Sequence, residues 1–170
     1  MEACAHSGEL LHQMIDVVSK NGNFMLNLGP RPDGTFDGPT VALLHEIGDW
    51  LAVNGEAVYG SRPFEIYGEG PTHQMGHVAF AKDRIPYTAE DIRFTRKENA
   101  LYVFLLGWPF AGKISVKALG KQGFLKEEIR KVTMLGNGGE LGFVQDTAAL
   151  TVTLPREKPC STAWVLKIEI

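Results

Sequence analysis

The sequence has 170 residues, of which 44% are hydrophobic and 22% are charged, and this balance is typical of a folded globular protein rather than a disordered one. The formal net charge of −3 excludes the basic surface that nucleic-acid binding requires, and no block of like charges occurs. No apolar stretch approaches the ~20 residues that cross a membrane, and two cysteines, Cys4 and Cys160, are too few for a disulfide framework, so we expect two free thiols.

The first predicted element is an amphipathic helix over residues 8–20. Ser7 can cap its first turn, and the Asn-Gly pair at residues 21–22 supplies a left-handed stop. His12 is expected on the polar face of this helix. The opposite face carries an apolar stripe at helical spacing, formed by Leu10, Leu11, Met14, Val17 and Val18.

A short apolar run over residues 24–28 follows at once and predicts a buried strand. Asn27 lies inside this run, where a polar side chain needs a hydrogen-bond partner or a ligand. A loop with two Asp-Gly pairs then leads to a second helix, which starts at Pro39 and runs to about residue 53. The buried face predicted for this helix consists of Leu43, Leu44, Ile47, Trp50 and Leu51. In parallel α/β folds, the loop after such a strand lies on the functional face.

From residue 91 onward, short apolar runs alternate with turn signals, a spacing typical of an antiparallel β-sandwich. The predicted strands cover residues 92–95, 101–106, 114–118, 129–135, 149–154 and 164–170. We therefore predict a mainly β protein, in which an antiparallel β-sandwich carries an N-terminal helix–strand–helix α/β segment. The predicted division places the α/β segment at residues 1–67 and the sandwich at residues 68–170.

The N-terminal segment cannot bury its own strand. A lone strand of the buried type exposes unpaired backbone groups and apolar side chains. The segment must therefore pack on the sandwich, on another copy of the chain, or on both. We expect a homo-oligomer that exchanges helices or pairs strands.

Motifs along most of the chain are similar to those of one enzyme family. They lie at residues 17–23, 26–30, 47–51, 53–60, 68–72, 87–95 and 100–102. Together they resemble the end of the catalytic barrel and the start of the C-terminal β-sandwich of the α-L-fucosidase glycoside hydrolase family. The last third of the chain matches by pattern alone.

This resemblance implies that a (β/α)8 barrel precedes the sandwich and that the present chain begins in the helix before the last barrel strand. It also implies retaining hydrolysis by an aspartate nucleophile and a carboxylic acid/base. Both belong to earlier parts of the barrel, so neither role matches a residue here. The end of the last barrel strand borders the sugar pocket in this family, and Asn27, Leu28 and Gly29 occupy those positions, with Leu28 facing the methyl group of the deoxysugar.

A retaining glycosidase needs two carboxyl groups ~5 Å apart, and an inverting one needs a wider gap. The catalytic candidates in this chain are Glu56, Asp33, Glu65 and Glu69. Simpler roles exist for each: Asp33 precedes a glycine and can form a turn, Glu56 can bond a loop backbone, and the other two can lie on the surface. Trp108, at a predicted hairpin end, is a further substrate-binding candidate because an exposed aromatic ring can stack on a sugar.

We expect neither a metal nor a cofactor. His73 and His77 share a loop with Glu69, but they lack the helical spacing and cysteine partners of common zinc sites. The first seven residues have neither a basic region nor an apolar core, so no secretory signal is expected and a cytoplasmic location is the default.

These observations leave three functions open. In the first, the chain is a minimal glycosidase that acts on a fucoside or a galactoside at a site rebuilt in an oligomer. In the second, it is a non-catalytic, carbohydrate-binding accessory domain of a split or truncated fucosidase. The third is an oligomeric sandwich without a ligand. A carbohydrate, further copies of the chain and a separate barrel-bearing chain are the expected partners. The absence of the nucleophile favours the non-catalytic functions.

Overall fold

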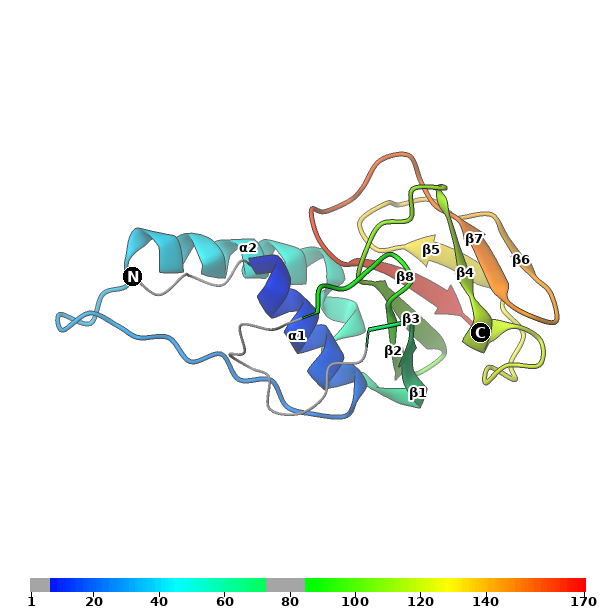
Figure 1. Cartoon of the computed structure of the whole chain (residues 1–170), viewed down its shortest axis with the longest axis horizontal. Coiled ribbons are helices and arrows are strands. Elements are labelled where there is room, and N and C mark those ends of the chain that lie inside the picture. The colour runs from blue at the N-terminus through cyan, green and yellow to red at the C-terminus, as the bar shows by residue number, and fades with distance from the viewer. Residues whose placement is uncertain (1–6, 73–84) are drawn as a thin grey trace.

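The computed structural model describes residues 7–72 and 85–170 (Figure 1). Two helices come first, α1 (Ser7–Ser19) and α2 (Gly38–Asn54), followed by a short 3-10 turn, η1 (Gly55–Ala57). The remaining elements of the described ranges are β1 (Arg62–Glu69), β2 (Ile92–Lys97), β3 (Ala100–Leu105), β4 (Lys113–Val116), η3 (Lys117–Leu119), β5 (Lys131–Met134), β6 (Phe143–Gln145), β7 (Leu150–Thr153) and β8 (Trp164–Glu169). Within these ranges, no helix is both long enough and apolar enough to cross a membrane.

The strands form two antiparallel sheets that pack as a sandwich. One sheet has five strands in the order β1-β2-β3-β8-β5, and the other has three in the order β4-β7-β6. An apolar core contains side chains from both sheets, among them Leu101 and Val103 of β3 and Leu150 and Val152 of β7. The mainly β sandwich predicted from the sequence is therefore confirmed.

β3 is buried on both faces, which explains why its sequence is continuously apolar rather than alternating. Leu101 and Val103 point into the sandwich, whereas Tyr102 and Phe104 point to the opposite face. There they form a second apolar cluster with α1 and with Trp50 of α2. The two helices thus cover the outer face of the five-stranded sheet.

A buried ion pair fixes α1 to this sheet. The Nε of Arg93, a β2 residue that is 1% exposed, donates to Asp16 Oδ1 of α1 at 2.6 Å, and Lys20 Nζ donates to Asp16 Oδ2 at 2.7 Å. The guanidinium also donates to the Ile92 carbonyl at 2.9 Å and lies 5.2 Å from the ring centre of Tyr87. Because a buried charge is stable only when it is paired, these contacts determine where α1 sits.

His12 lies inside this interface, so the prediction that it occupies the polar face of the helix is wrong. Its ring meets Tyr87 edge-on with 5.3 Å between ring centres, and its Nε2 atom is buried without a hydrogen-bond partner among the described residues. Burial and the charge of Arg93 lower the pKa of His12, against smaller opposing effects from Glu9 and Asp91. The ring is therefore held neutral at neutral pH.

The lowered pKa of His12 predicts a loss of stability on acidification. In the unfolded chain the imidazole has its ordinary pKa of 6.5, so the unfolded state takes up a proton before the folded state does. The contribution of neutral His12 to the free energy of unfolding is therefore complete above pH 6.5 and is lost as the pH falls through the lower pKa of the folded state. We expect the thermal midpoint of the wild type to fall more steeply between about pH 7 and about pH 5.5 than that of His12→Gln.

The matched control is His45→Gln, because His45 lies exposed on α2. This variant should follow the wild-type curve. Parallel curves for the wild type and His12→Gln would contradict the assignment.

The strand predicted over residues 24–28 is wrong. This segment forms no ladder, and it runs from the end of α1 far out to the start of α2 (Figure 1). A strand requires a neighbour for its backbone hydrogen bonds, and no strand in the described ranges pairs with it. Met25, at the centre of the apolar run, is 89% exposed.

The face predicted to be buried on α2 is covered only in part. Asp37 caps the helix, as its position before the helix suggests, and Trp50 near the other end is buried. The indole Nε1 of Trp50 donates to the carbonyls of Thr162 and Ala163, each at 2.8 Å. The other predicted face residues are half-buried: Leu43, Leu44, Ile47 and Leu51. α2 is therefore attached through its C-terminal half, and its N-terminal half projects beyond the sheets (Figure 1).

Candidate functional site

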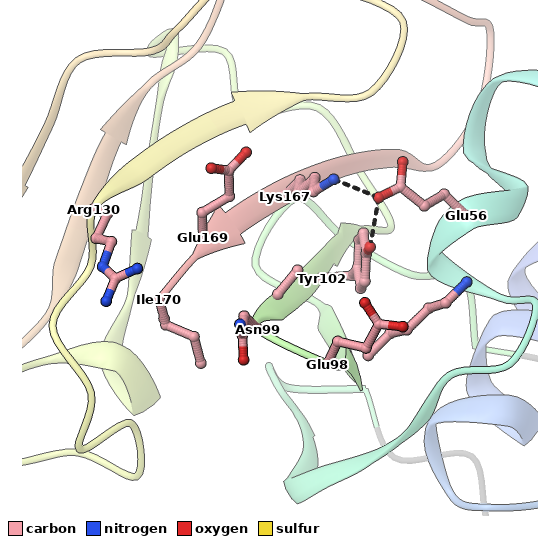
Figure 2. A pocket seen from close by; sticks show the side chains of 10 residues that line it. Glu56, Glu98, Asn99, Tyr102, Arg130, Lys167, Glu169 and Ile170 are labelled. Atoms are coloured by element: carbon pink, nitrogen blue, oxygen red, sulfur yellow. Dashed lines mark hydrogen bonds and ion pairs between the residues drawn. The ribbon is translucent and has the colours of Figure 1, made fainter.

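An open pocket of about 590 Å³ lies where β8 ends and β3 begins (Figure 2). Its charged side chains balance, because three are cations and three are carboxylates. They are Lys97, Arg130, Lys167, Glu56, Glu98 and Glu169. Glu56 comes from η1, directly after α2, whereas the others belong to the five-stranded sheet and its flanking turns. The pocket thus joins the end of the helical segment to the sandwich.

Glu56 is the candidate carboxylate that lines this pocket, and two donors hold it. Tyr102 Oη donates to Glu56 Oε1 at 2.7 Å, and Lys167 Nζ donates to the same oxygen at 2.5 Å (Figure 2). The hydrogen bonds from Lys167 and then Tyr102 hold the pKa of Glu56 below its usual range. Burial and the bond to Glu56 raise the pKa of Tyr102. Glu56 is therefore an ionised acceptor, and a general acid would need the opposite shift.

The other three candidate carboxylates lie elsewhere. Asp33 accepts from the amide and the hydroxyl of Thr35 at 3.0 and 2.7 Å, which forms a turn and lowers the pKa of Asp33. Glu69 accepts from two backbone amides at the start of η3, at 3.1 and 2.8 Å, and joins β1 to that turn. Glu65 is exposed on β1. In the described part of the chain, no hydrogen bond joins two of the four candidates, and Glu56 alone of the four lines this pocket. Their catalytic roles stay predictions.

The three candidates carried over from the last barrel strand lie on the extended segment. Asn27 and Gly29 are exposed, and Leu28 is half-buried. None of the three lines the pocket at Glu56 or its neighbouring cavity. Their substrate-binding role stays a prediction.

Trp108 is half-buried at the turn after β3. Its ring meets Trp164 edge-on with 4.9 Å between ring centres, and Lys158 Nζ lies 5.3 Å from its centre. The wholly exposed aromatic side chain at this turn is Phe110. Stacking of a sugar on Trp108 would have to displace the lysine, and it stays a prediction.

In residues 7–72 and 85–170, no group of three or more potential ligands could hold a metal ion. His73, His77 and Cys4 lie outside the described residues, so the loop considered for a metal is not described. Cys160 is a free thiol, and burial raises its pKa.

Sequence reasoning misses Tyr102 and Lys167, which hold Glu56 in place. Lys167 interrupts the apolar run of β8. A single polar residue in an otherwise apolar strand needs a partner, so the reasoning applied to Asn27 identifies Lys167 as well. The phenol of Tyr102 gives a similar signal within β3.

The fold and the site together define a class of protein. It is a β-sandwich whose outer face carries two helices, with an extended segment that pairs with no strand in the described ranges. The family comparisons agree with this class. A model of α-L-fucosidase matches residues 1–56, and a model of the α-L-fucosidase C-terminal domain matches residues 86–169. The chain belongs to the α-L-fucosidase family, in which it corresponds to the C-terminal part.

Individual relatives show how much of such a protein is present. Tissue α-L-fucosidase of Rattus norvegicus is 29% identical over 173 residues, which cover 99% of this chain and 33% of that protein. The human tissue enzyme is 28% identical over 94% of this chain and 31% of its own length. The crystal structure of Thermotoga maritima α-fucosidase with a mechanism-based inhibitor matches with a TM-score of 0.75 and 30% identity, over 99% of this chain and 35% of that one. The chain thus spans about a third of the length of these relatives.

Proposed function

We propose that this protein acts as the C-terminal part of an α-L-fucosidase, in which residues 20–37 and α2 complete a catalytic (β/α)8 barrel. The observation that carries the proposal is the extended segment. Residues 24–28 are apolar and of the type that forms a buried strand, yet they form no ladder and Met25 is 89% exposed. A barrel strand beside this segment would bond its backbone and cover its side chains.

The exposed half of α2 supports the same function. Its apolar residues include Leu43 and Leu44, which are half-buried, and Val41, which is 40% exposed. A helix that is apolar on several sides is normally enclosed by other elements. A barrel would cover both this helix and the extended segment, and relatives of about three times the length have room for one.

The substrate class follows from the relatives, and the chemistry would come from the barrel. One Thermotoga maritima α-fucosidase structure is a complex with fucose, which supports an α-L-fucoside as substrate. In the present chain, Glu56, Asp33 and Glu69 are each engaged by donors within the fold. We therefore place the nucleophile and the acid/base outside this chain and give Glu56 no catalytic role in the proposal.

The test is a chimaera in which this chain replaces the matching C-terminal part of the Thermotoga maritima enzyme. We expect the chimaera to release nitrophenol from the α-L-fucoside, and the purified chain alone to release none from α-L-fucoside or β-galactoside. Met25→Asp should lower the activity of the chimaera by about tenfold or more, because a barrel would bury the new charge. The control is Val144→Asp on β6, where Val144 is 68% exposed, and it should keep full activity.

Two results would contradict the proposal. Equal activities of Met25→Asp and Val144→Asp would show that the segment is not covered. Turnover by the chain alone that disappears in Glu56→Gln or Asp33→Asn would instead identify a minimal glycosidase. The homo-oligomer stays a prediction, and sedimentation of the wild type and Met25→Asp would reveal a second copy on the same face.

A further inference from the structure

The charged side chains that line the pocket at Glu56 have no role in completing a barrel. The pocket's three cationic side chains balance its three carboxylate side chains, so the lining favours neither a polyanion nor a polycation. Its aromatic residue, Tyr102, is 2% exposed and offers no ring face for stacking. The pocket has the volume of a small-molecule site, about 590 Å³, and a lining of hydrogen-bonding groups. An uncharged, strongly hydrogen-bonding ligand fits it best.

Glu56 is held in a fixed position with one oxygen free. Both of its hydrogen bonds, from Tyr102 and Lys167, go to Oε1, and Oε2 accepts none from the described residues. The ammonium of Lys167 has three donors and uses one of them here. Both side chains are partly exposed, Lys167 by 26% and Glu56 by 44%. A carboxylate acceptor and an ammonium donor therefore stand side by side at an open pocket (Figure 2).

A pair of neighbouring hydroxyl groups complements this arrangement. One hydroxyl donates to Glu56 Oε2, and its neighbour accepts from the Lys167 ammonium. The ligand then satisfies both groups without adding charge to a balanced pocket. Lys97 and Glu169 extend the lining and can bond further hydroxyls of the same ring or of a second one.

We propose that this pocket is a binding site for a neutral saccharide, held through a vicinal diol between Glu56 and Lys167. The site is separate from the extended segment and from the N-terminal half of α2, and the inference does not depend on the barrel. It replaces the catalytic role considered for Glu56 with a binding role.

The test is an NMR titration of the ¹⁵N-labelled chain with L-fucose, D-galactose and, separately, inorganic phosphate. We expect saturable shifts for the sugars at the amides of Glu98, Asn99 and Lys167, with dissociation constants in the millimolar range. Glu56→Gln and Lys167→Met should each weaken binding by about tenfold, because each removes a charge-assisted hydrogen bond. Dispersed spectra of both variants establish that they are folded, and each variant tests the proposal if the other fails to fold.

Glu127→Gln is the matched control. Glu127 also accepts from a cation, Arg96 at 2.6 Å, and lines the neighbouring cavity rather than this one. Its substitution should leave sugar binding unchanged. The proposal is overturned if neither sugar gives saturable shifts, if Glu56→Gln binds as the wild type does, or if phosphate alone saturates the same amides. None of these outcomes alters the activity expected of the chimaera, so the two proposals fail separately.

Discussion

Replacing Asp16 with asparagine is expected to lower the free energy of unfolding by about 3–5 kcal/mol, because it leaves the buried guanidinium of Arg93 without its counter-charge. Arg93 is 1% exposed and its Nε lies 2.6 Å from Asp16 Oδ1. Among the described residues, the remaining partners of Arg93 are backbone carbonyls and tyrosine rings, which do not neutralise it. Urea unfolding followed by circular dichroism measures the effect.

The same strand offers a matched control. Arg96, three residues along β2, pairs with Glu127 at 2.6 Å, but both side chains are partly exposed, Arg96 by 35% and Glu127 by 42%. Glu127→Gln should therefore cost within about 1 kcal/mol. A further variant, Asp16→Leu with Arg93→Leu, should recover part of the stability, since it removes both charges. An Asp16→Asn protein as stable as Glu127→Gln would contradict the role given to the buried pair.

Replacing Trp50 with alanine is the second large effect, and we expect it to cost about 3–5 kcal/mol. Trp50 is 4% exposed, and its indole donates to the Thr162 and Ala163 carbonyls just before β8. It is one of two buried residues of α2, the other being Asn54. The substitution therefore removes the buried aromatic side chain of α2 together with both of its hydrogen bonds to the sandwich. Hydrogen exchange of the α2 amides, together with urea unfolding, provides the measurement.

Trp50→Phe separates packing from hydrogen bonding. It keeps an aromatic ring but leaves both carbonyls without the indole donor, and we expect a cost of about 1–3 kcal/mol. His45→Ala, on the exposed side of the same helix, should change little. If the α2 amides stay as protected in Trp50→Ala as in the wild type, the helix is held by other contacts.

The elements that sequence analysis predicts well are those that fold against neighbours within the chain. Six strands of the sandwich and the helix from residue 8 pack against other elements of the described chain. The predicted stop of that helix is also present, with Asn21 at a φ of 63°. β6 escapes prediction because three residues, Phe143–Gln145, are too few to show an alternating pattern. β1 runs across the predicted boundary at residue 67, and the division into domains stays a prediction.

Two of the failed predictions, the strand at residues 24–28 and the fully buried face of α2, concern residues that lack a covering partner in the described part of the chain. The run at residues 24–28 has the composition of a buried strand, but composition cannot supply a neighbouring strand. The apolar residues in the N-terminal half of α2, such as Leu43 and Leu44, are likewise half-buried, because the described elements cover them only in part. The pocket at Glu56 escaped notice because it is built from residues about 110 positions apart, Glu56 and Lys167, and no spacing rule links them.

The order of the strands also governs how the chain can fold while it is being made. β8 lies between β3 and β5, so that Glu169 pairs with Ala100 on one side and with Lys131 on the other. Until residue 169 leaves the ribosome, both neighbours keep an open edge, and the outer face on which α1 rests lacks Val165. Because pairings between residues so distant in the sequence form late, β3 and β5 are joined into one sheet only once β8 lies between them. The outer apolar cluster that joins this sheet to α1 is thus completed only after Val165 of β8 has been made.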